Sequence, residues 1–292
     1  MKFHAYAKIN LTLDITGVRQ DGYHELSSVM QQISLFDDVD ITVEPAEENF
    51  VSFDVASCRF LPSDSRNTCV KAAHVFLENY GLEHVGVYIR LKKRIPIGSG
   101  MGGGSSDAAA TLKALNSMLG VGAPASELRR LGLKVGADVP FFIDGGCQLV
   151  QGIGDRLKPL DLKFKEYFLI VKPACSALTE DIYKKFDEIS GADYSSRHTD
   201  AFLAEAGADG GDPLKFAANR LQDVTQQLLP QVAELYEELR GYSPRACMTG
   251  SGSALFAAFG SWFKANKALQ TFNRRDGLFA KLCLACDADI TQ

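Results

Sequence analysis

The spacing of apolar residues changes several times along the chain, and each change predicts a new element. Residues 1–16 first alternate and then become apolar at every second position from Ile9 to Ile15. This period of two, with its β-branched side chains, is typical of a strand. Short apolar runs predict further strands at 29–35, 39–43, 51–55 and 85–91. The first part of the chain is therefore expected to be mainly β-structure.

Helical spacing appears around and after these runs. Residues 68–80 place Val70, Ala73 and Leu77 on one face, and Gly81 follows as a C-terminal cap. The same reasoning predicts helices at 106–119, which is rich in alanine, and at 125–133. The apolar residues of 141–150 are expected to return to strand.

The periodicity breaks around residues 155–159, which predicts an N-terminal domain of residues 1–157 and a C-terminal domain of residues 158–292. In the second domain, strands are predicted at 167–171, 246–248, 254–259 and 279–286, and helices at 179–189, 228–240 and 263–272. Residues 193–212 are polar and rich in glycine and alanine, so part of them is expected to form a mobile loop. Strands and helices mix without a regular β-α-β order, which indicates an α+β fold.

Composition and charge narrow the class of protein. The 292 residues are 46% apolar and 23% charged, as in soluble globular proteins. The net charge of -5 argues against a nucleic-acid partner, since duplex binders usually carry a basic excess. No apolar run approaches the ~20 residues that span a bilayer, and Met1 leads directly into the first strand without a signal peptide. A cytoplasmic protein without a membrane partner is expected; the sequence leaves the oligomeric state open.

The cysteines and histidines predict no metal site. Seven cysteines, an odd number, lie mostly among apolar neighbours, which suits reduced thiols in a reducing compartment. Cys283 and Cys286 have the spacing of a zinc ligand pair, but no second pair or nearby histidine accompanies them. We expect core or surface thiols.

The stretch 96–107, with sequence PIGSGMGGGSSD, carries the most information about function. Its five glycines allow positive φ angles and a close approach of the backbone to a ligand. Two serines and Asp107 then open the alanine-rich helix. Free N–H groups at a helix start, together with the helix dipole, bind anions, and glycine turns add a concave nest of amides. The neighbouring cations of 92–94 favour a phosphate site here.

Several interpretations of this glycine loop are possible. A Walker A loop requires lysine where this chain has Gly104, so that motif fails. Gly98, Gly100 and Gly103 satisfy the dinucleotide fingerprint, but a dense glycine run meets many patterns by chance. The protein-kinase loop fails because no His-Arg-Asp or Asp-Phe-Gly follows. A flexible linker is the remaining alternative, which the flanking strand and helix disfavour.

The loop resembles the central motif of the GHMP kinase superfamily, which includes galactokinase, homoserine kinase, mevalonate kinase and phosphomevalonate kinase. AKINL at 7–11 resembles the first motif of that superfamily, and TGSGS at 249–253 resembles the third. The resemblance implies a ribosomal-protein-like N-terminal domain, a ferredoxin-like C-terminal domain, and a site in the cleft between them. It implies ATP as a cofactor, with Mg²⁺ expected because the ion bridges phosphate oxygens.

Within the superfamily, DGYHEL at 21–26 and GADVPFF at 136–142 resemble the 4-diphosphocytidyl-2-C-methyl-D-erythritol kinases. This resemblance implies transfer of the ATP γ-phosphoryl group to the 2-hydroxyl of a cytidine diphosphate sugar alcohol in the non-mevalonate isoprenoid pathway. Arg220 and Gln222 depart from the Asn-Asp-Leu-Glu that this family often carries at 219–222. Another GHMP kinase, of the homoserine or phosphomevalonate type, and a non-catalytic nucleotide-binding module are the alternatives.

Two charged residues are the candidates for catalysis. Asp138 lies between Gly136 and Pro140 on a turn, where it is either the base that takes a proton from the acceptor alcohol or an Asx turn or cap. Lys8 is a lone cation in an apolar strand, and buried lysines are rare without a partner. We expect Lys8 to pair with Asp138 and keep it ionised, the alternative being a lysine that snorkels at a sheet edge.

The remaining candidates follow from the resemblance. Asn10 is expected to hydrogen-bond the substrate or Lys8, and Tyr23 and His24 are expected to stack on and hydrogen-bond the cytosine. Asn67 matches a position close to the adenine, or else caps the helix that follows. The predicted ATP-binding residues are Asn67, Pro96, Gly98, Gly100, Met101, Gly102, Gly103, Gly104, Ser105, Ser106 and Asp107. The predicted substrate-binding residues are Asn10, Tyr23, His24, Gly250 and Ser251. Direct metal ligands are not assigned.

Overall fold

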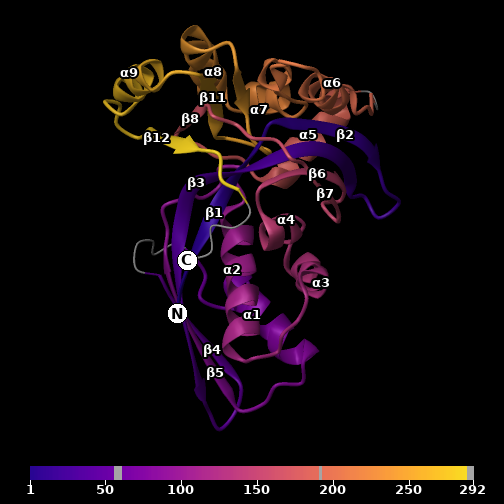
Figure 1. The fold of residues 1–292 in the computed structure, drawn as a ribbon, viewed down its shortest axis with the longest axis vertical. Coiled ribbons are helices and arrows are strands. Elements are labelled where there is room, and N and C mark those ends of the chain that lie inside the picture. The colour runs from indigo at the N-terminus through magenta and orange to yellow at the C-terminus, as the bar shows by residue number, and fades with distance from the viewer. Residues whose placement is uncertain (56–60, 191–192, 288–292) are drawn as a thin grey trace.

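The computed structural model describes residues 1–55, 61–190 and 193–287, which form two packed bodies. In Figure 1 the lower body, coloured indigo to magenta, contains the first half of the chain, and the upper body, orange to yellow, contains most of the second half. The strands β2 and β3 extend from the lower body to the upper one, where β2 lies near α5 and α6.

A large mixed sheet forms the lower body, and its central strand is β3 (His24–Pro45). This strand pairs antiparallel with four others, because its 22 residues are long enough to offer different segments to different partners. The other strands of this sheet are β1 (Lys2–Asn10), β2 (Thr12–Val18), β4 (Phe50–Val55), β5 (Val85–Lys92), β6 (Cys147–Gly152), β7 (Arg156–Pro159) and β9 (Ala218–Asn219).

Four helices pack on one side of this sheet: α1 (Thr68–Asn79), α2 (Gly103–Met118), α3 (Ala125–Val135) and α4 (Val139–Asp144). Their apolar faces bury Phe76, Leu112 and Phe141 against Ile41 and Ile89 of the sheet. Full burial of such a side chain stabilises the fold by about 1.5–3 kcal/mol relative to exposure. The alanines of α2 allow this helix to approach the sheet and α1 closely.

A four-stranded antiparallel sheet forms the upper body, in the order β10 (Ala246–Met248), β11 (Leu255–Phe259), β8 (Tyr167–Lys172) and β12 (Phe279–Leu284). The helices of this body are α5 (Thr179–Ser190), α6 (Arg197–Ala206), α7 (Gln222–Leu228), α8 (Pro230–Tyr242) and α9 (Trp262–Phe272), with a 3-10 turn at Pro213–Phe216. The short strand β9 pairs parallel with β2, so the two bodies share backbone hydrogen bonds.

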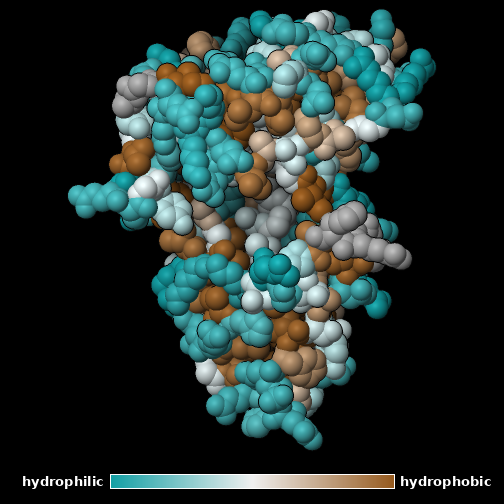
Figure 2. All heavy atoms as spheres, turned by 180° about the vertical axis from the view of Figure 1, so that it is seen from behind, coloured by the Kyte–Doolittle hydropathy of each residue, from teal (hydrophilic) through white to brown (hydrophobic). Residues whose placement is uncertain are grey.

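The α+β class predicted from the sequence is confirmed by these two sheets and their helices. The division at residues 157 and 158 stays a prediction, and β7 spans it. No helix of the described residues is long and apolar enough to cross a membrane. From behind, hydrophilic residues dominate both ends of the molecule and hydrophobic residues appear between them (Figure 2).

Residues 141–150 do not form the single strand that was predicted. The first four belong to the helix α4, and β6 begins only at Cys147. The prediction failed because a fully buried helix and a buried strand have the same unbroken apolar pattern. Gly145 and Gly146 both have positive φ angles and separate the two elements.

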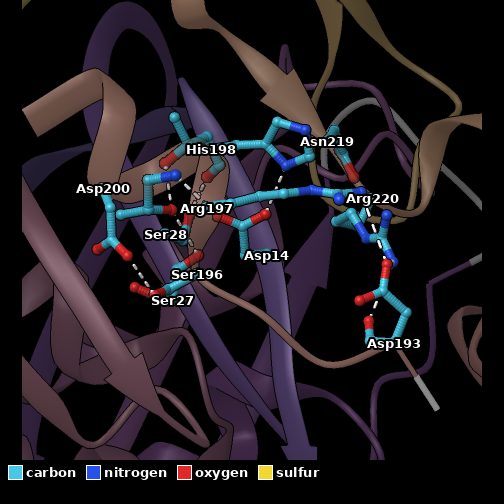
Figure 3. A network of polar contacts seen from close by, with 12 residues as sticks. Asp14, Ser27, Ser28, Asp193, Ser196, Arg197, His198, Asp200, Asn219 and Arg220 are labelled. Atoms are coloured by element: carbon cyan, nitrogen blue, oxygen red, sulfur yellow. Dashed lines mark hydrogen bonds and ion pairs between the residues drawn. The ribbon is translucent and has the colours of Figure 1, made fainter. Parts of the chain in front are cut away.

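Residues 193–212 contain a helix where a mobile loop was expected. The helix α6 is anchored by Asp14 of β2, whose carboxylate is fully buried and accepts hydrogen bonds from the Thr199 amide and the His198 ring, both at 2.7 Å. Figure 3 shows the contact between Asp14 and His198, which lies between β2 and α6. A buried carboxylate requires such donors, and the expectation missed them because they come from distant parts of the chain. Six cysteines in the described residues are free thiols, as predicted, and Cys58 lies outside those residues.

Candidate functional site

A cavity of about 850 Å³ lies where the two bodies meet. It is lined by Lys8 and Asn10 of β1, by Tyr23 and by His24, the first residue of β3, by the glycine loop, by Asp138, by α5 and by the turn at 250–252. A smaller cavity of about 280 Å³ lies on the other side of the glycine loop and is lined by Asn67, Thr68, Lys93, Pro96 and further loop residues. Gly98, Gly100, Gly102 and Ser105 line both cavities.

The glycine loop forms this shared wall because its backbone adopts conformations that other residues avoid. Gly98, Gly100 and Gly102 have φ angles of 61°, 72° and 69°. Gly102 caps α2, which begins at Gly103 rather than at residue 106, since the left-handed cap lets the helix start three residues earlier. The free amides of the first turn therefore belong to Gly103, Gly104 and Ser105, which all line the smaller cavity.

The glycine turn at 249–253 packs directly on this loop. A Cβ on Gly100 would overlap the carbonyl oxygen of Thr249 and lie 3.1 Å from the Gly252 nitrogen. The Ala254 amide donates to the Ser99 carbonyl across the same contact. The predicted central and third motifs thus form one double turn, in which Gly250 and Ser251 face the large cavity.

Lys8 is buried between three oxygen atoms of this region. Its ammonium lies 2.6 Å from Asn10 Oδ1, 2.9 Å from the Gly100 carbonyl oxygen and 3.5 Å from Asp138 Oδ2. The predicted contact with Asp138 is therefore present, and Lys8 does not snorkel at an edge because it is almost inaccessible to solvent. A buried ammonium needs this degree of compensation to remain charged.

Asp138 faces the large cavity from the residue that precedes α4. Its side chain is 33% exposed, so an acceptor can reach the carboxylate while Lys8 holds the other side. It makes no side-chain hydrogen bond to the helix amides, so the capping alternative is not realised. Tyr183 of α5 lines the same cavity, and burial, and next the charge of Asp138, raise the pKa of its phenol.

Asn10 is fully buried, and its side chain forms hydrogen bonds with other groups of the protein. Its amide oxygen accepts from Lys8 and from the Gly250 amide, and its amide nitrogen donates to Ser28 at 2.8 Å. Of its two predicted roles, the contact with Lys8 is observed. Substrate binding by Asn10 stays a prediction; the residue lines the large cavity, and its amide oxygen also positions Lys8 and the third motif.

A polar network continues from Asn10 to the anchor of α6. Ser28 donates to the Thr12 carbonyl, and the Thr12 hydroxyl lies 2.9 Å from the hydroxyl of Thr199, which follows His198 on α6. Figure 3 shows the neighbouring contacts of Asp14, His198 and Ser28 between β2 and α6. All of these hydroxyl groups are buried, so the network fixes β1 and β2 relative to the upper body.

Tyr23 and His24 line one end of the large cavity. Tyr23 is 64% exposed, whereas the His24 ring lies 2.7 Å from Asp187 Oδ1 and packs on Tyr183 with ring centroids 4.7 Å apart. Sequence reasoning missed the roles of Tyr183 and Asp187. Their spacing of four residues on a helix, which puts both on one face of α5, was the available signal.

Two predicted ATP-binding residues are buried in the protein. The Ser106 hydroxyl donates to the Tyr6 carbonyl at 2.6 Å, and the Met101 side chain is inaccessible and packs in the core. Neither side chain reaches the cavities, so a contact of Ser106 or Met101 with ATP stays a prediction that their side chains do not support. Asn67 caps α1, as its alternative role required, and also lines the smaller cavity.

Asp107 borders the smaller cavity but is also almost fully buried. Lys93 lies between Asp107, at 2.7 Å, and the buried carboxylate of Asp37. Two carboxylates share this ammonium, so the cluster carries excess negative charge. Burial, and then the charge of Asp37, outweigh the effect of Lys93 and raise the pKa of Asp107 to about 7. A contact of Asp107 with phosphate stays a prediction; Lys93 occupies its Oδ2 atom, and its Oδ1 atom has no hydrogen-bond partner in the described residues.

We expect Asp107→Asn to remove a pH dependence of stability. Because an unfolded aspartate titrates near pH ~3.9, between about pH 4 and pH 7 the folded protein holds a proton that the unfolded chain has released. Linkage then requires that the free energy of unfolding falls as pH rises through this window. Urea denaturation at several pH values without added ligands measures the slope.

The matched control is Asp64→Asn, because hydrogen bonds from Arg66 lower the pKa of the exposed Asp64 carboxyl to about 2, below that window. This variant should keep the wild-type slope between pH 5 and pH 7. An Asp107→Asn variant with the wild-type slope would show that Asp107 is already ionised at pH 5.

This chain is similar to known proteins both in its sequence motifs and in its architecture. Residues 67–146 match the family described as GHMP kinases N terminal domain. The protein named 4-diphosphocytidyl-2-C-methyl-D-erythritol kinase of Clostridium beijerinckii is 38% identical over 272 residues, which are 91% of this chain and 93% of that protein. The protein of the same name from Carboxydothermus hydrogenoformans is 41% identical over 261 residues, 88% of each chain.

A solved structure agrees with these relatives. The crystal structure of 4-(cytidine 5'-diphospho)-2C-methyl-D-erythritol kinase superposes with a TM-score of 0.75 at 30% identity, and the match covers 98% of this chain and all of that one. Sequence and architecture therefore agree over nearly the whole length of the chain.

Proposed function

The chain belongs to the family of 4-diphosphocytidyl-2-C-methyl-D-erythritol kinases, which are GHMP kinases, and we propose that it transfers the γ-phosphoryl group of ATP to the 2-hydroxyl of 4-diphosphocytidyl-2-C-methyl-D-erythritol. The observation that carries this proposal is the glycine loop that separates two cavities, with the pair of Lys8 and Asp138 on the acceptor side. The reaction would be a step in the non-mevalonate formation of isoprenoid precursors.

The smaller cavity is the place for the nucleotide. Its wall offers the amides of Gly103, Gly104 and Ser105 at the start of α2, which is the arrangement that binds phosphate oxygens. Asn67 lies at the same cavity and can bond a purine edge. The γ-phosphate would then project past Gly100 and Gly102 into the large cavity, where the acceptor binds.

Asp138 acts as the base in this mechanism. As the acceptor oxygen forms its bond to the γ-phosphorus, the hydroxyl proton passes to the Asp138 carboxylate and ADP leaves. Lys8 lies 3.5 Å from that carboxylate and holds it beside the acceptor. The same ammonium stabilises negative charge that develops on the transferred group, which is how phosphoryl-transfer enzymes achieve most of their rate.

The far end of the large cavity suits the cytidine group. His24 is oriented by Asp187 and can hydrogen-bond a base edge, while the exposed ring of Tyr23 can stack on the base. Tyr183 packs against His24 and lines the same cavity as Asp138, so one face of α5 borders both base recognition and the reacting centre.

Magnesium fits the nucleotide side of the site. The described residues contain no group of three potential metal ligands, so the ion would be held mainly by phosphate oxygens, as Mg²⁺ commonly is. The unpartnered Oδ1 of Asp107 and the hydroxyl of Ser105 are two of the side-chain oxygens that line that cavity and could contact the ion. The bound ion would neutralise charge on the triphosphate.

An acceptor panel tests the proposal. ADP release should depend on 4-diphosphocytidyl-2-C-methyl-D-erythritol and should be slower by about tenfold or more with its uridine analogue, since a lost buried hydrogen bond costs about 1.4 kcal/mol or more. Homoserine, mevalonate and phosphomevalonate should give background rates. Turnover with one of those alcohols would assign another GHMP activity, and ATP binding without release on any acceptor would indicate a non-catalytic module. We place the reaction in the cytoplasm, which suits the free buried cysteines.

A further inference from the structure

One face of α5 holds the ring of His24, the first residue of β3. Phe186 and Asp187 follow Tyr183 by three and four residues on this helix, so the three side chains share one face. The His24 ring packs on Tyr183 with centroids 4.7 Å apart, and it forms an edge contact with Phe186 at 6.4 Å and 80°. A helix of the upper body therefore fixes the plane of a ring that belongs to the lower sheet.

The two ring nitrogens of His24 have different surroundings. Nε2 lies 2.7 Å from Oδ1 of Asp187, and an ionised carboxylate can only accept a hydrogen bond. Nδ1 has no hydrogen-bond partner in the described residues, yet it is not one of the unpaired polar atoms that are closed to solvent. Because His24 lines the large cavity, Nδ1 is the polar ring atom that it offers to a ligand there.

This arrangement sets the direction of the hydrogen bond at the free nitrogen. A neutral imidazole carries its proton on one nitrogen and a lone pair on the other. When Asp187 holds the proton on Nε2, Nδ1 becomes an acceptor. The Asp187 side chain is 45% exposed, so water solvates the carboxylate and it needs no second partner in the protein.

Cytosine and uracil differ at the group that such an acceptor recognises. Cytosine carries an amino group at position 4, which is a donor, whereas uracil, like thymine, carries a carbonyl oxygen there, which is an acceptor. An acceptor nitrogen held in place can bond the amino group, but it meets the uracil oxygen lone pair against lone pair. A site that hydrogen-bonds one group rejects the analogue that lacks it, because its own polar atom is then left unpaired.

We propose that Asp187 is a positioning residue that makes the cavity selective for a cytosine base over a uracil base, by holding the His24 proton on Nε2 so that Nδ1 accepts from the 4-amino group. This role rests on the proposed function, which places the cytidine group at this end of the cavity. Asp187 need not touch the substrate, since it acts through the ring of His24.

Asp187→Asn tests this role with little change of shape. The asparagine amide has an oxygen that accepts and a nitrogen that donates, so it can bond either tautomer of His24. The proton is then no longer confined to Nε2, and the ring can present an Nδ1–H group to the uracil oxygen. A purely structural defect would weaken the binding of both bases, whereas release of the proton weakens cytosine binding alone.

Isothermal titration of the full chain with cytidine diphosphate (CDP) and uridine diphosphate (UDP), at saturating ADP to occupy the smaller cavity, measures the selectivity. The wild type should bind CDP about tenfold more tightly than UDP, or more, as one hydrogen bond to the base implies. In Asp187→Asn the dissociation constant for CDP should rise about threefold or more, while that for UDP stays the same or falls. The matched control Glu188→Gln removes an exposed carboxylate of α5 that lies outside the cavity and should keep the wild-type ratio.

The position of the proton can be measured directly. Long-range nitrogen–proton NMR spectra of histidine rings show which nitrogen carries it, and at about pH 8 an imidazole is mostly neutral. His24 should be protonated on Nε2 in the wild type and should show a mixture of both tautomers in Asp187→Asn. The chain has five histidines, and a His24→Asn variant identifies the His24 signals by their loss.

A ratio of the two dissociation constants that is unchanged in Asp187→Asn would overturn this role alone. A wild-type ring with protons on both nitrogens would also overturn it, because Nδ1 would then be a donor. Selectivity that is lost while the tautomer stays the same would show that Asp187 contacts the base itself. If neither CDP nor UDP bound to the wild type, the placement of the cytidine group in the proposed function would fail, and this role with it.

Discussion

Asp138→Asn is expected to leave the fold intact and to reduce turnover by about 10²–10⁴-fold, the usual contribution of a general base. A carboxamide has nearly the same shape as a carboxylate, but it cannot accept the acceptor's proton. Lys8 keeps its bonds to Asn10 and to the Gly100 carbonyl, so the buried ammonium is not left without partners. Because Asp138 is one-third exposed, its replacement should cost little stability.

Single-turnover kinetics and thermal denaturation measure these two effects separately. Asp181→Asn is the matched control, because it removes an exposed carboxylate from α5 that lies outside the cavity. It should retain turnover within about twofold, as surface substitutions usually do. Near-native turnover of Asp138→Asn with an unchanged acceptor dependence would remove Asp138 from the role of base.

Gly100→Ala is expected to impair both nucleotide binding and stability. An alanine at this φ of 72° costs about 1–2 kcal/mol of backbone strain. Its Cβ would also overlap the Thr249 carbonyl, and overpacking of this kind costs about 1–3 kcal/mol more. Relief of the overlap must push apart the two glycine turns that surround the phosphate path, so KM for ATP should rise about tenfold or more, a loss of at least ~1.4 kcal/mol.

The matched control Gly120→Ala distinguishes the effect of backbone strain from that of steric overlap. Gly120 has nearly the same φ, 66°, but a Cβ there meets no atom within 4 Å. This variant should lose only the ~1–2 kcal/mol of backbone strain and keep the wild-type KM for ATP. If Gly100→Ala and Gly120→Ala were equally stable and bound ATP equally well, the contact between the two glycine turns would have no role in the nucleotide site.

Much of the candidate site could be predicted because its motifs are local. The backbone conformation of residues 96–107 can be predicted from their sequence, because only glycine readily adopts the left-handed turns observed there. A lysine inside an apolar strand also demanded polar partners, and the half-buried Asp138 is one of them, beside Asn10 and the Gly100 carbonyl. The roles assigned to these residues remain predictions until the variants are measured.

Other parts of the site could not be predicted, because they depend on contacts between distant segments. The helical phase of α2 follows from a cap at Gly102, and a shift of three residues turned Ser106 from the phosphate side into the protein. The cluster of Asp37, Lys93 and Asp107 joins positions up to 70 residues apart, and no local spacing of residues in the sequence predicts it.

The sequence by itself determined the α+β class, the glycine loop and the pairing of a buried lysine with a carboxylate, because each follows from the period of apolar residues, the steric freedom of glycine or the cost of an unpaired charge. Tertiary structure alone decided that 141–144 is helical, that α6 replaces a loop, and that His24 is oriented by Asp187. In each of these cases a buried polar or apolar group obtained its partners from another part of the chain. The free energy of those tertiary contacts exceeds the small conformational preferences of the local sequence.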